Sequence, residues 1–262
     1  MIITAAQGAL GLASGALVGF SLGLVGGGGS ILAVPLMVYL VGVSEPHVAI
    51  GTSAIAVAAN AGINLSNHAR GGTVIWSVAL IFAASGMLGA FGGSILGKMM
   101  DGERLLALFA LIMIVIALLM LKTRSRIGLP DVKVSMSNMP AIIGLGLATG
   151  TISGFFGIGG GFLIVPALML ATGMPILNAV SSSLVAVTAF GMTTAASYAW
   201  SGLVSWALAG LFVAGGIAGG LAGTRSGRHL AGRRGALNIV FAMVIIAVAI
   251  YMLARNISLF HP

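Results

Sequence analysis

The stretch GLVGGGGSILAVP, at Gly23–Pro35, returns in the second half of the chain as GFFGIGGGFLIVP, at Gly154–Pro166. A shift of 131 residues aligns four glycines, a leucine, a valine and the proline of the two stretches. After one missing residue, a shift of 130 pairs Trp76 with Trp206. Tryptophan and proline are rare in this chain, so the agreement indicates two homologous halves. Duplicated halves are typical of transporter folds, whose substrate sites lie where the repeats meet.

The composition around these stretches places the chain in a membrane. Of its 262 residues, 59% are hydrophobic and only 6% are charged, and the mean hydropathy is +1.16. A soluble domain carries about 25% charged residues, so a water-facing surface cannot be built from this chain. The alternating pattern of a transmembrane β-barrel is absent, which leaves helical spans. The absence of cysteine excludes disulfides and thiolate metal sites.

Ten apolar segments predict the helices of an all-α polytopic membrane protein. They are Ala5–Val25, Ser30–Val41, Val48–Leu65, Val74–Leu96, Leu105–Leu121, Met139–Phe156, Phe162–Ala171, Leu177–Trp200, Leu203–Ala222 and Ala236–Leu253. The second and seventh are shorter than the roughly 20 residues that cross a bilayer, so we expect short or broken helices there. The chain divides into a first transmembrane repeat, 1–122, a basic cytoplasmic linker, 123–138, and a second transmembrane repeat, 139–262.

Loop charge distinguishes inverted from parallel repeats. If the short segments cross the membrane, one side holds only Lys98, Arg104 and Arg255. The other side then holds nine basic residues: Arg70, Lys122, Arg124, Arg126, Lys133, Arg225, Arg228, Arg233 and Arg234. If the short segments dip in and return, the split is six against six. Because lysine and arginine gather on the cytoplasmic side, we predict inverted repeats of about five segments each, with both termini outside. The net charge of +8 is thereby explained without a nucleic-acid partner.

The two glycine clusters are the candidate substrate site. Consecutive glycines interrupt a helix, and a short helix that begins at such a break directs free N–H groups and the positive end of its dipole into it. Matched breaks in both halves favour an anion site, although a plain turn at the membrane surface is the alternative. The predicted ligands at the breaks are Gly27, Gly28, Gly29, Ser30, Gly159, Gly160 and Gly161. Glycines spaced four apart elsewhere predict close helix packing, or surfaces on which two bundles rock.

Small polar side chains lie near the breaks in both halves. Thr52, Ser53, Ser182 and Ser183 can donate hydrogen bonds to an oxyanion, although such residues also serve ordinary helix packing in membranes. Asn60 continues a polar stripe on the third segment and is expected to face inward.

Charged and metal-binding chemistry is sparse along the chain. Among four acids, only Glu45, beside His47, lies close to a short segment, and this pair is a weak candidate for proton coupling. With so few acids, we expect a small anionic substrate and surrounding lipid as partners, and neither a metal nor a cofactor. The oligomeric state is left open.

The glycine-to-proline motifs, followed by EPHVAIGTS in the first half and NAVSSSLVAV in the second, resemble the sulfite exporter TauE/SafE family over nearly the whole chain. The resemblance implies a proton-coupled carrier of sulfite, sulfoacetate or related organosulfonates in the cytoplasmic membrane. Alternating access is the expected mechanism for such a repeat fold. The alternatives are a channel or carrier for another small anion, and an intramembrane enzyme. The enzyme needs a buried base beside a serine such as Ser153, and the histidines are expected in loops or at interfaces.

Overall fold

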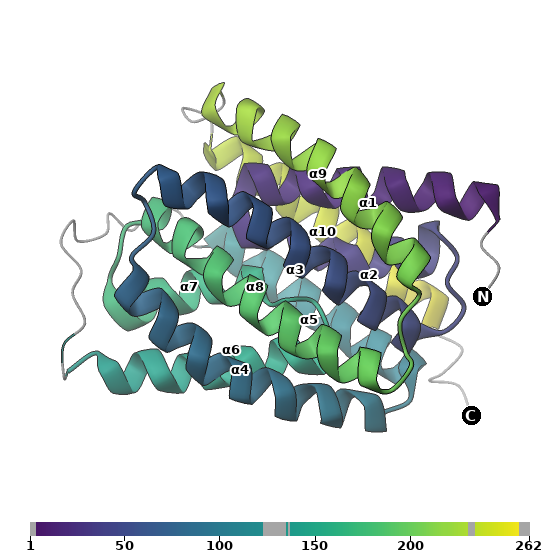
Figure 1. Cartoon of the computed structure of the whole chain (residues 1–262), viewed down its shortest axis with the longest axis horizontal. Coiled ribbons are helices and arrows are strands. Elements are labelled where there is room, and N and C mark those ends of the chain that lie inside the picture. Colours follow the sequence, from purple (N-terminus) through teal and green to yellow (C-terminus); the bar gives the residue numbers. More distant parts are fainter. Residues whose placement is uncertain (1–3, 123–134, 136, 230–233, 257–262) are drawn as a thin grey trace.

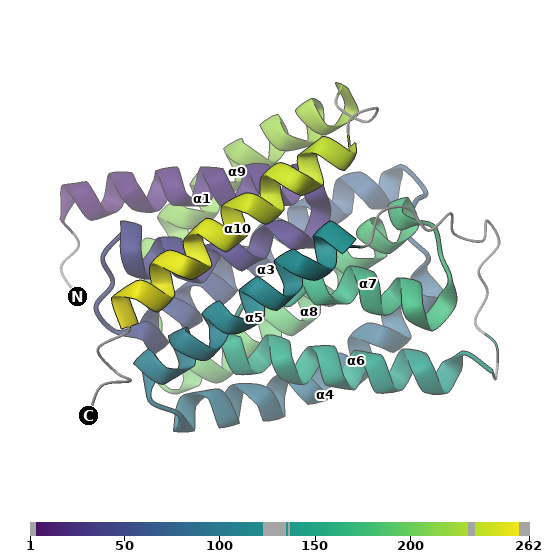
Figure 2. The same cartoon turned by 180° about the vertical axis from the view of Figure 1, so that it is seen from behind.

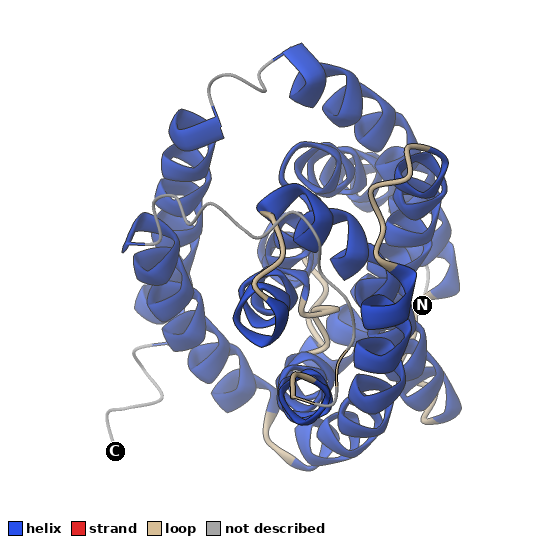
Figure 3. Ribbon diagram, turned by 90° about the vertical axis from the view of Figure 1, so that its left-hand side faces the viewer, coloured by secondary structure: helices blue, strands red, loops and turns tan. Residues whose placement is uncertain are grey.

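The computed structural model describes residues 4–122, 135, 137–229 and 234–256, and over these residues it contains helices and no strand (Figures 1 and 3). The helices are α1 (Ala5–Val25), α2 (Ala33–Pro35), α3 (Pro46–Arg70), α4 (Trp76–Met99), α5 (Gly102–Lys122), α6 (Met139–Phe156), α7 (Gly161–Thr172), α8 (Ile176–Trp200), α9 (Trp206–His229) and α10 (Arg234–Asn256). A 3-10 segment, η1 (Gly26–Leu32), and a π-helical segment, η2 (Leu36–Leu40), flank α2.

Among the residues that the structure describes, six helices are long and apolar enough to cross a membrane: α1, α3, α4, α6, α8 and α9. The prediction of an all-helical polytopic protein is therefore confirmed, and two predicted spans, Ala5–Val25 and Met139–Phe156, match α1 and α6 at both ends. The main difference is that α9 continues past Ala222 to His229. Hydropathy reports where the lipid ends, whereas a helix can continue into the polar interface.

The packing of the helices maps onto itself when the two halves are exchanged. α1 packs along α9, and its equivalent α6 packs along α4, the equivalent of α9. The other main contacts join equivalent helices directly, α3 with α8 and α5 with α10, the latter pair lying side by side in Figure 2. α1 begins and α10 ends at one end of the bundle, on the right in Figure 1.

Glycine ridges allow the close approach of α1 to α9 and of α6 to α4. A Cβ atom added at Gly19 would lie 2.0 Å from the carbonyl oxygen of Gly216. The equivalent contact in the other half joins Gly150 to the Gly86 carbonyl oxygen, at 2.1 Å. The spaced glycines thus serve helix packing in both pairs, as lipid-embedded helices require when no hydrophobic force drives them together.

α3 and α8 form the centre of the bundle and run antiparallel. Near the start of α3, Gly51 lies against Tyr198, close to the end of α8. At the other end of the pair, His68 Nδ1 lies 3.0 Å from Ser181 Oγ. α3 and α8 are equivalent segments of the two halves, so this pair of equivalent helices is antiparallel.

The three tryptophans lie at helix ends and face outward. Trp76 begins α4, Trp200 ends α8 and Trp206 begins α9, with exposed fractions of 47%, 95% and 68%. Large apolar side chains such as Leu88 and Leu170 are also more than two-thirds exposed between these ends. Tryptophan is enriched where a bilayer meets water, so this pattern fits a lipid-facing surface with its interfacial belts.

Candidate functional site

The second glycine cluster forms a sharp break between α6 and α7. Gly157 ends α6 with φ +67°, and its N–H donates to the Ser153 carbonyl oxygen. Gly159 and Gly160 follow with φ +66° and +64°, and Gly160 is the residue immediately before α7. L-residues with a side chain rarely adopt these angles, so the turn depends on glycine. As the sequence predicts, a new helix N-terminus begins here, at Gly161.

The first cluster behaves differently. Gly27, Gly28, Gly29 and Ser30 all lie within the 3-10 segment η1, which leads directly into the three-residue helix α2. The predicted short segment of this half is present as an apolar helical segment, Gly29–Leu40, but the backbone enters it through 3-10 turns instead of a sharp reversal.

The two clusters meet at the centre of the bundle. η1 packs against α7 and α8. A Cβ atom at Gly159 would lie 2.9 Å from Val57 Cγ1 and 3.3 Å from Val187 Cγ1. Val57 and Val187 are equivalent residues of α3 and α8, so the break lies where the two central helices cross. These valines cover it.

The structure does not bring the four predicted hydroxyl ligands together. Thr52 Oγ1 accepts the N–H of Ser205 at 3.0 Å, in the loop before α9. Ser182 Oγ accepts the N–H of Ile75 at 3.0 Å, in the equivalent loop before α4. Because α3 and α8 are antiparallel, these two contacts lie at opposite ends of the central pair. Each hydroxyl holds the loop that leads into the fourth segment of the other half.

Ser53 and Ser183 are also equivalent and also engaged. Ser53 Oγ donates to the Ile50 carbonyl oxygen at 2.9 Å, and Ser183 Oγ donates to the Val180 carbonyl oxygen at 2.8 Å. Both side chains are fully buried. Such bonds to the preceding helical turn satisfy a hydroxyl locally, and a role of either serine in binding stays a prediction.

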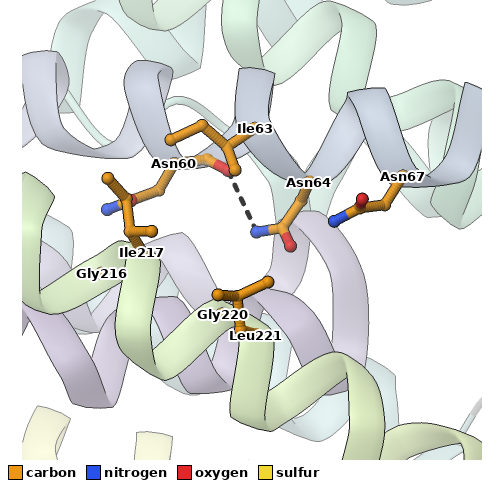
Figure 4. Close-up of a pocket in the computed structure, with 8 residues that line it drawn as sticks. All are labelled: Asn60, Ile63, Asn64, Asn67, Gly216, Ile217, Gly220 and Leu221. Carbon is orange, nitrogen blue, oxygen red and sulfur yellow. Dashed lines mark hydrogen bonds between the residues drawn. The ribbon is translucent and has the colours of Figure 1, made fainter.

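Asn60 lies on a polar stripe of α3 that faces α9 (Figure 4). Its side chain is 1% exposed, and neither Oδ1 nor Nδ2 has a hydrogen-bond partner. Asn64 Nδ2 donates to the Asn60 carbonyl oxygen at 3.0 Å. The groove between the helices is lined by Asn60, Ile63, Asn64, Asn67, Gly216, Ile217, Gly220 and Leu221. It leaves no room for a water molecule, so the amide of Asn60 stays unsatisfied.

The equivalent position in the other half is apolar. Phe190 replaces Asn60 and packs on Gly86 of α4, where a Cβ atom would lie 2.0 Å from its ring. The ring also stacks on Phe82 at a centroid distance of 6.2 Å. The two equivalent positions therefore differ: Phe190 fills an aromatic core in the second half, whereas Asn60 is a buried amide without a hydrogen-bond partner in the first half.

Ser153 was not among the predicted ligands, yet it lies at the second break. It is fully buried, and its Oγ has no hydrogen-bond partner. A Cβ atom at Gly160 would lie 2.8 Å from this oxygen. The internal repeat could have pointed to Ser153. The shift of 131 aligns it with Leu22, so the second half has a hydroxyl where the first half has an apolar side chain.

Glu45 and His47 lie at the start of α3. Glu45 is exposed, and its carbonyl oxygen accepts the Ala49 N–H. His47 Nε2 donates to the Met100 carbonyl oxygen at 3.0 Å. Nδ1 is buried without a partner. One turn further on, Ile50 contacts Gly157, so the histidine is one helical turn from the break.

Acidic and metal-binding groups do not gather among the described residues, where no cluster of three or more His, Cys, Asp or Glu side chains is present. Lys98 donates to the Ser197 carbonyl oxygen and to Ser201 Oγ, both at 3.0 Å, near the end of α8. The second break is instead formed by glycine backbone, a serine hydroxyl and apolar side chains. This combination suits an anion that is held by neutral donors.

The chain is similar to one protein family and to several curated proteins. The family described as "Sulfite exporter TauE/SafE" matches residues 11–252. A "Probable membrane transporter protein" of Xylella fastidiosa strain Temecula1 is 52% identical over 246 residues, which cover 94% of each chain. The "Probable membrane transporter protein YunE" of Bacillus subtilis strain 168 is 31% identical over 79% of this chain and 84% of its own length. No solved structure shows a significant match.

Proposed function

Because the chain belongs to the sulfite exporter TauE/SafE family and is a multi-pass membrane transporter rather than an enzyme, we propose that it carries a small sulfur oxyanion or organosulfonate, such as sulfite or sulfoacetate, across the cytoplasmic membrane. The observation that carries this proposal is the second glycine break. It places the N-terminus of α7, a helix of 12 residues, at the crossing of the two central helices.

The chemistry of the break favours an anion. The first N–H groups of a helix have no intrahelical partner and lie at the positive end of the helix dipole, which together attract negative charge. Gly159, Gly160 and Gly161 expose this backbone, because none of them has a side chain to cover it. Neutral donors bind more weakly than a buried lysine or arginine, so the anion can be released on the far side. The 3-10 segment with Gly27–Ser30 borders the site from the first half.

We propose alternating access between inverted halves as the mechanism. The antiparallel packing of α3 and α8 supports inversion, and the exchange of α1 and α6 between the halves supports two bundles that move against each other. The Thr52–Ser205 and Ser182–Ile75 contacts are equivalent latches at opposite ends. In this mechanism one latch opens while the other stays closed, and the substrate at the centre is exposed to one side at a time.

Proton coupling is assigned to His47 in this proposal. Its buried Nδ1 can accept a proton, and its ring is held by the bond from Nε2 to the Met100 carbonyl oxygen. Its place one turn before Ile50, which contacts Gly157, lets a change of charge reach the break. Glu45, exposed at the surface, is the second candidate for the proton path.

Solid-supported membrane electrophysiology on reconstituted protein tests the function. Sulfite, sulfoacetate, taurine, thiosulfate and sulfate are applied in turn over a pH series, with protein-free liposomes as the control. We expect saturable transient currents for one or more of the sulfur anions, larger when a proton gradient is imposed. Currents that do not saturate, or that are carried equally by chloride, indicate a channel instead. If none of these anions produces a current, the proposal is wrong.

A further inference from the structure

We propose that the transporter has a single, one-sided anion site, in which Ser153 is a direct ligand beside the N-terminus of α7 and the first half contributes no equivalent donor. The inference rests on the proposed function, because it names the residue that completes the anion site at the second break. It starts from the unsatisfied hydroxyl of Ser153, which no feature of the helix packing explains.

The hydroxyl of Ser153 is one of four buried hydroxyls without a partner among the described residues, with those of Ser14, Thr194 and Tyr198, and it is the one that lies against Gly160. Thr149, one turn earlier on α6, donates to the Leu145 carbonyl oxygen at 2.6 Å, and Ser53 and Ser183 also bond to the preceding turn. Ser153 is equally buried, but its Oγ has no partner. An unmade hydrogen bond in an apolar interior is costly, so such a group is expected where a ligand supplies the partner.

The hydroxyl is directed at a helix N-terminus. Gly160 immediately precedes α7, and its carbonyl oxygen accepts the N–H groups of Leu163 and Ile164. The N–H groups of Gly161 and Phe162, in the first turn, have no carbonyl to bond within α7. A Cβ atom at Gly160 would lie 2.7 Å from Ser153 Cβ and 2.8 Å from Ser153 Oγ. Only glycine therefore permits the hydroxyl to lie so close to this backbone.

The first half has the same backbone contact, but the hydroxyl beside it is already engaged. Ser21 Cβ lies 2.8 Å from a Cβ atom built at Gly29, and Ser21 Oγ donates to the Leu17 carbonyl oxygen at 2.9 Å. The shift of 131 aligns Gly160 with Gly29 and Ser153 with Leu22. A Cβ atom at Gly29 would lie 2.4 Å from the Leu22 nitrogen, so the glycine approaches the same turn of the preceding helix in both halves. Leu22 is apolar and 1% exposed, and the backbone at this break continues through the 3-10 segment η1 into the apolar helical segment Gly29–Leu40.

The ligand that fits is a compact group with several oxygens on one central atom, such as a sulfonate or sulfite. One oxygen accepts the Ser153 hydroxyl, and others accept the N–H groups of the first turn of α7. With no cation among these donors, the site discriminates by shape and by the number of acceptors. An apolar tail on the substrate is accommodated by the valines that cover the break, Val57 and Val187.

Binding measurements on the detergent-purified protein test the assignment, with sulfite and sulfoacetate as probes. The Ser153→Ala variant is compared with Leu22→Met, a volume-conserving change at the equivalent position of the other half, and with Ser153→Thr, which keeps the hydroxyl. A hydrogen bond to a charged group corresponds to a loss of about tenfold or more in affinity. We expect that loss for Ser153→Ala, recovery in Ser153→Thr, and less than about a twofold change for Leu22→Met, because Leu22 has no donor to lose and its volume is kept.

Thermal stability without ligand separates binding from structure. Removing a hydroxyl that has no partner leaves the unliganded protein as stable as wild type, or more so. Lower stability of Ser153→Ala without ligand, or wild-type affinity in this variant, would overturn the assignment. Equal losses in Ser153→Ala and Leu22→Met would show that packing at the two equivalent positions, and not the Ser153 hydroxyl, sets the affinity. If the wild-type protein binds neither probe, the proposed function fails together with the inference.

A second measurement does not depend on the alanine variants. The chain has no cysteine, so Ser153→Cys and Leu22→Cys each introduce the only thiol. We expect sulfoacetate to slow modification of the thiol at position 153 by a small methanethiosulfonate reagent, and to leave the rate at position 22 unchanged. Equal protection at both positions, or none at position 153, contradicts a one-sided site.

Discussion

Replacing Gly215 by alanine is the most direct test of the packing between α1 and α9. A Cβ atom at Gly215 would lie 2.0 Å from the Leu12 carbonyl oxygen. Gly210, on the same helix, has no other atom within 4 Å of the equivalent position and faces outward. The two glycines therefore differ in what a methyl group meets, while their intrinsic helix propensities are the same.

The expected effects have opposite signs. Alanine in place of a helical glycine stabilises by about 0.5–1 kcal/mol because less backbone entropy is lost on folding. At Gly210 this gain stands alone. At Gly215 the added carbon overlaps rigid backbone, and forcing extra volume into a packed interface costs about 1–3 kcal/mol or more. We expect Gly210→Ala to be more stable than wild type and Gly215→Ala to be less stable by about 1–2 kcal/mol or more.

Thermal unfolding of the detergent-purified variants, followed by loss of the monodisperse peak, measures the difference. A change of 1 kcal/mol corresponds to roughly 2–4 °C in Tm for a chain of this size. Gly89→Ala and Gly92→Ala on α4 form a second pair, since only Gly89 is close to backbone, 2.2 Å from the Leu147 carbonyl oxygen. Shifts of the same sign within either pair would refute the close backbone contact between the paired helices.

Four further variants or pairs address the site and the topology. Gly160→Ala and Gly202→Ala both force alanine into a positive φ, at a cost of about 1–2 kcal/mol, but only Gly160 faces Ser153. Substrate uptake into proteoliposomes should therefore be lost in Gly160→Ala and retained in Gly202→Ala. Thr52→Val and Ser182→Ala each leave a loop N–H unpaired, so the Tm should fall by the equivalent of about 1–3 kcal/mol, while the Kd for substrate stays unchanged; a raised Kd would indicate direct binding instead. Asn60→Leu removes an unsatisfied amide, and we expect equal or higher thermal stability with reduced transport current; full current would exclude Asn60 from the path. Single cysteines at Arg126 and at the exposed Thr4 should be labelled by impermeant reagents from the cytoplasm and from outside, respectively, and labelling of both from one side would contradict an odd number of crossings per half.

The helices were predictable from the sequence because lipid imposes a simple rule on composition. Each long apolar run in the described chain is a helix, and the run at Phe162–Ala171 became α7, one residue longer at each end. The contrast between the two glycine clusters was not predictable in the same way. Both are rich in glycine, but glycine permits left-handed turns without requiring them. Contacts with Ile50, Val57 and Ser153 accompany the left-handed turn at Gly157–Gly160.

The prediction that the equivalent hydroxyls converge overlooked the geometry of the repeat. Equivalent residues on two antiparallel helices meet only near the point where the helices cross, and they separate along the axis on either side. Val57 and Val187 lie close to that point, because both contact Gly159. Thr52 and Ser182 are further from it, so each meets a loop of the other half. The sequence repeat identifies which residues of α3 and α8 are equivalent, but it does not give their distance from the point where the two helices cross.

The distribution of unsatisfied polar groups follows from the same symmetry. Thr52 with Ser182, and Ser53 with Ser183, are matched in both halves, and all four have partners. Buried polar atoms without a partner lie on Ser14, His47, Asn60, Ser153, Thr194 and Tyr198. The repeat aligns Ser14, His47, Asn60 and Ser153 with the apolar residues Leu145, Leu177, Phe190 and Leu22, whereas Thr194 and Tyr198 align with the polar Asn64 and His68. Polar residues that occur at equivalent positions of both halves make equivalent hydrogen bonds within the protein, and these hydrogen bonds stabilise the fold. A substrate bound between the two halves is itself asymmetric. Each of its atoms contacts a residue of one half and not the equivalent residue of the other half, so a binding residue does not have to be present in both halves. The unmatched, unsatisfied residues are therefore where substrate selectivity is expected to reside.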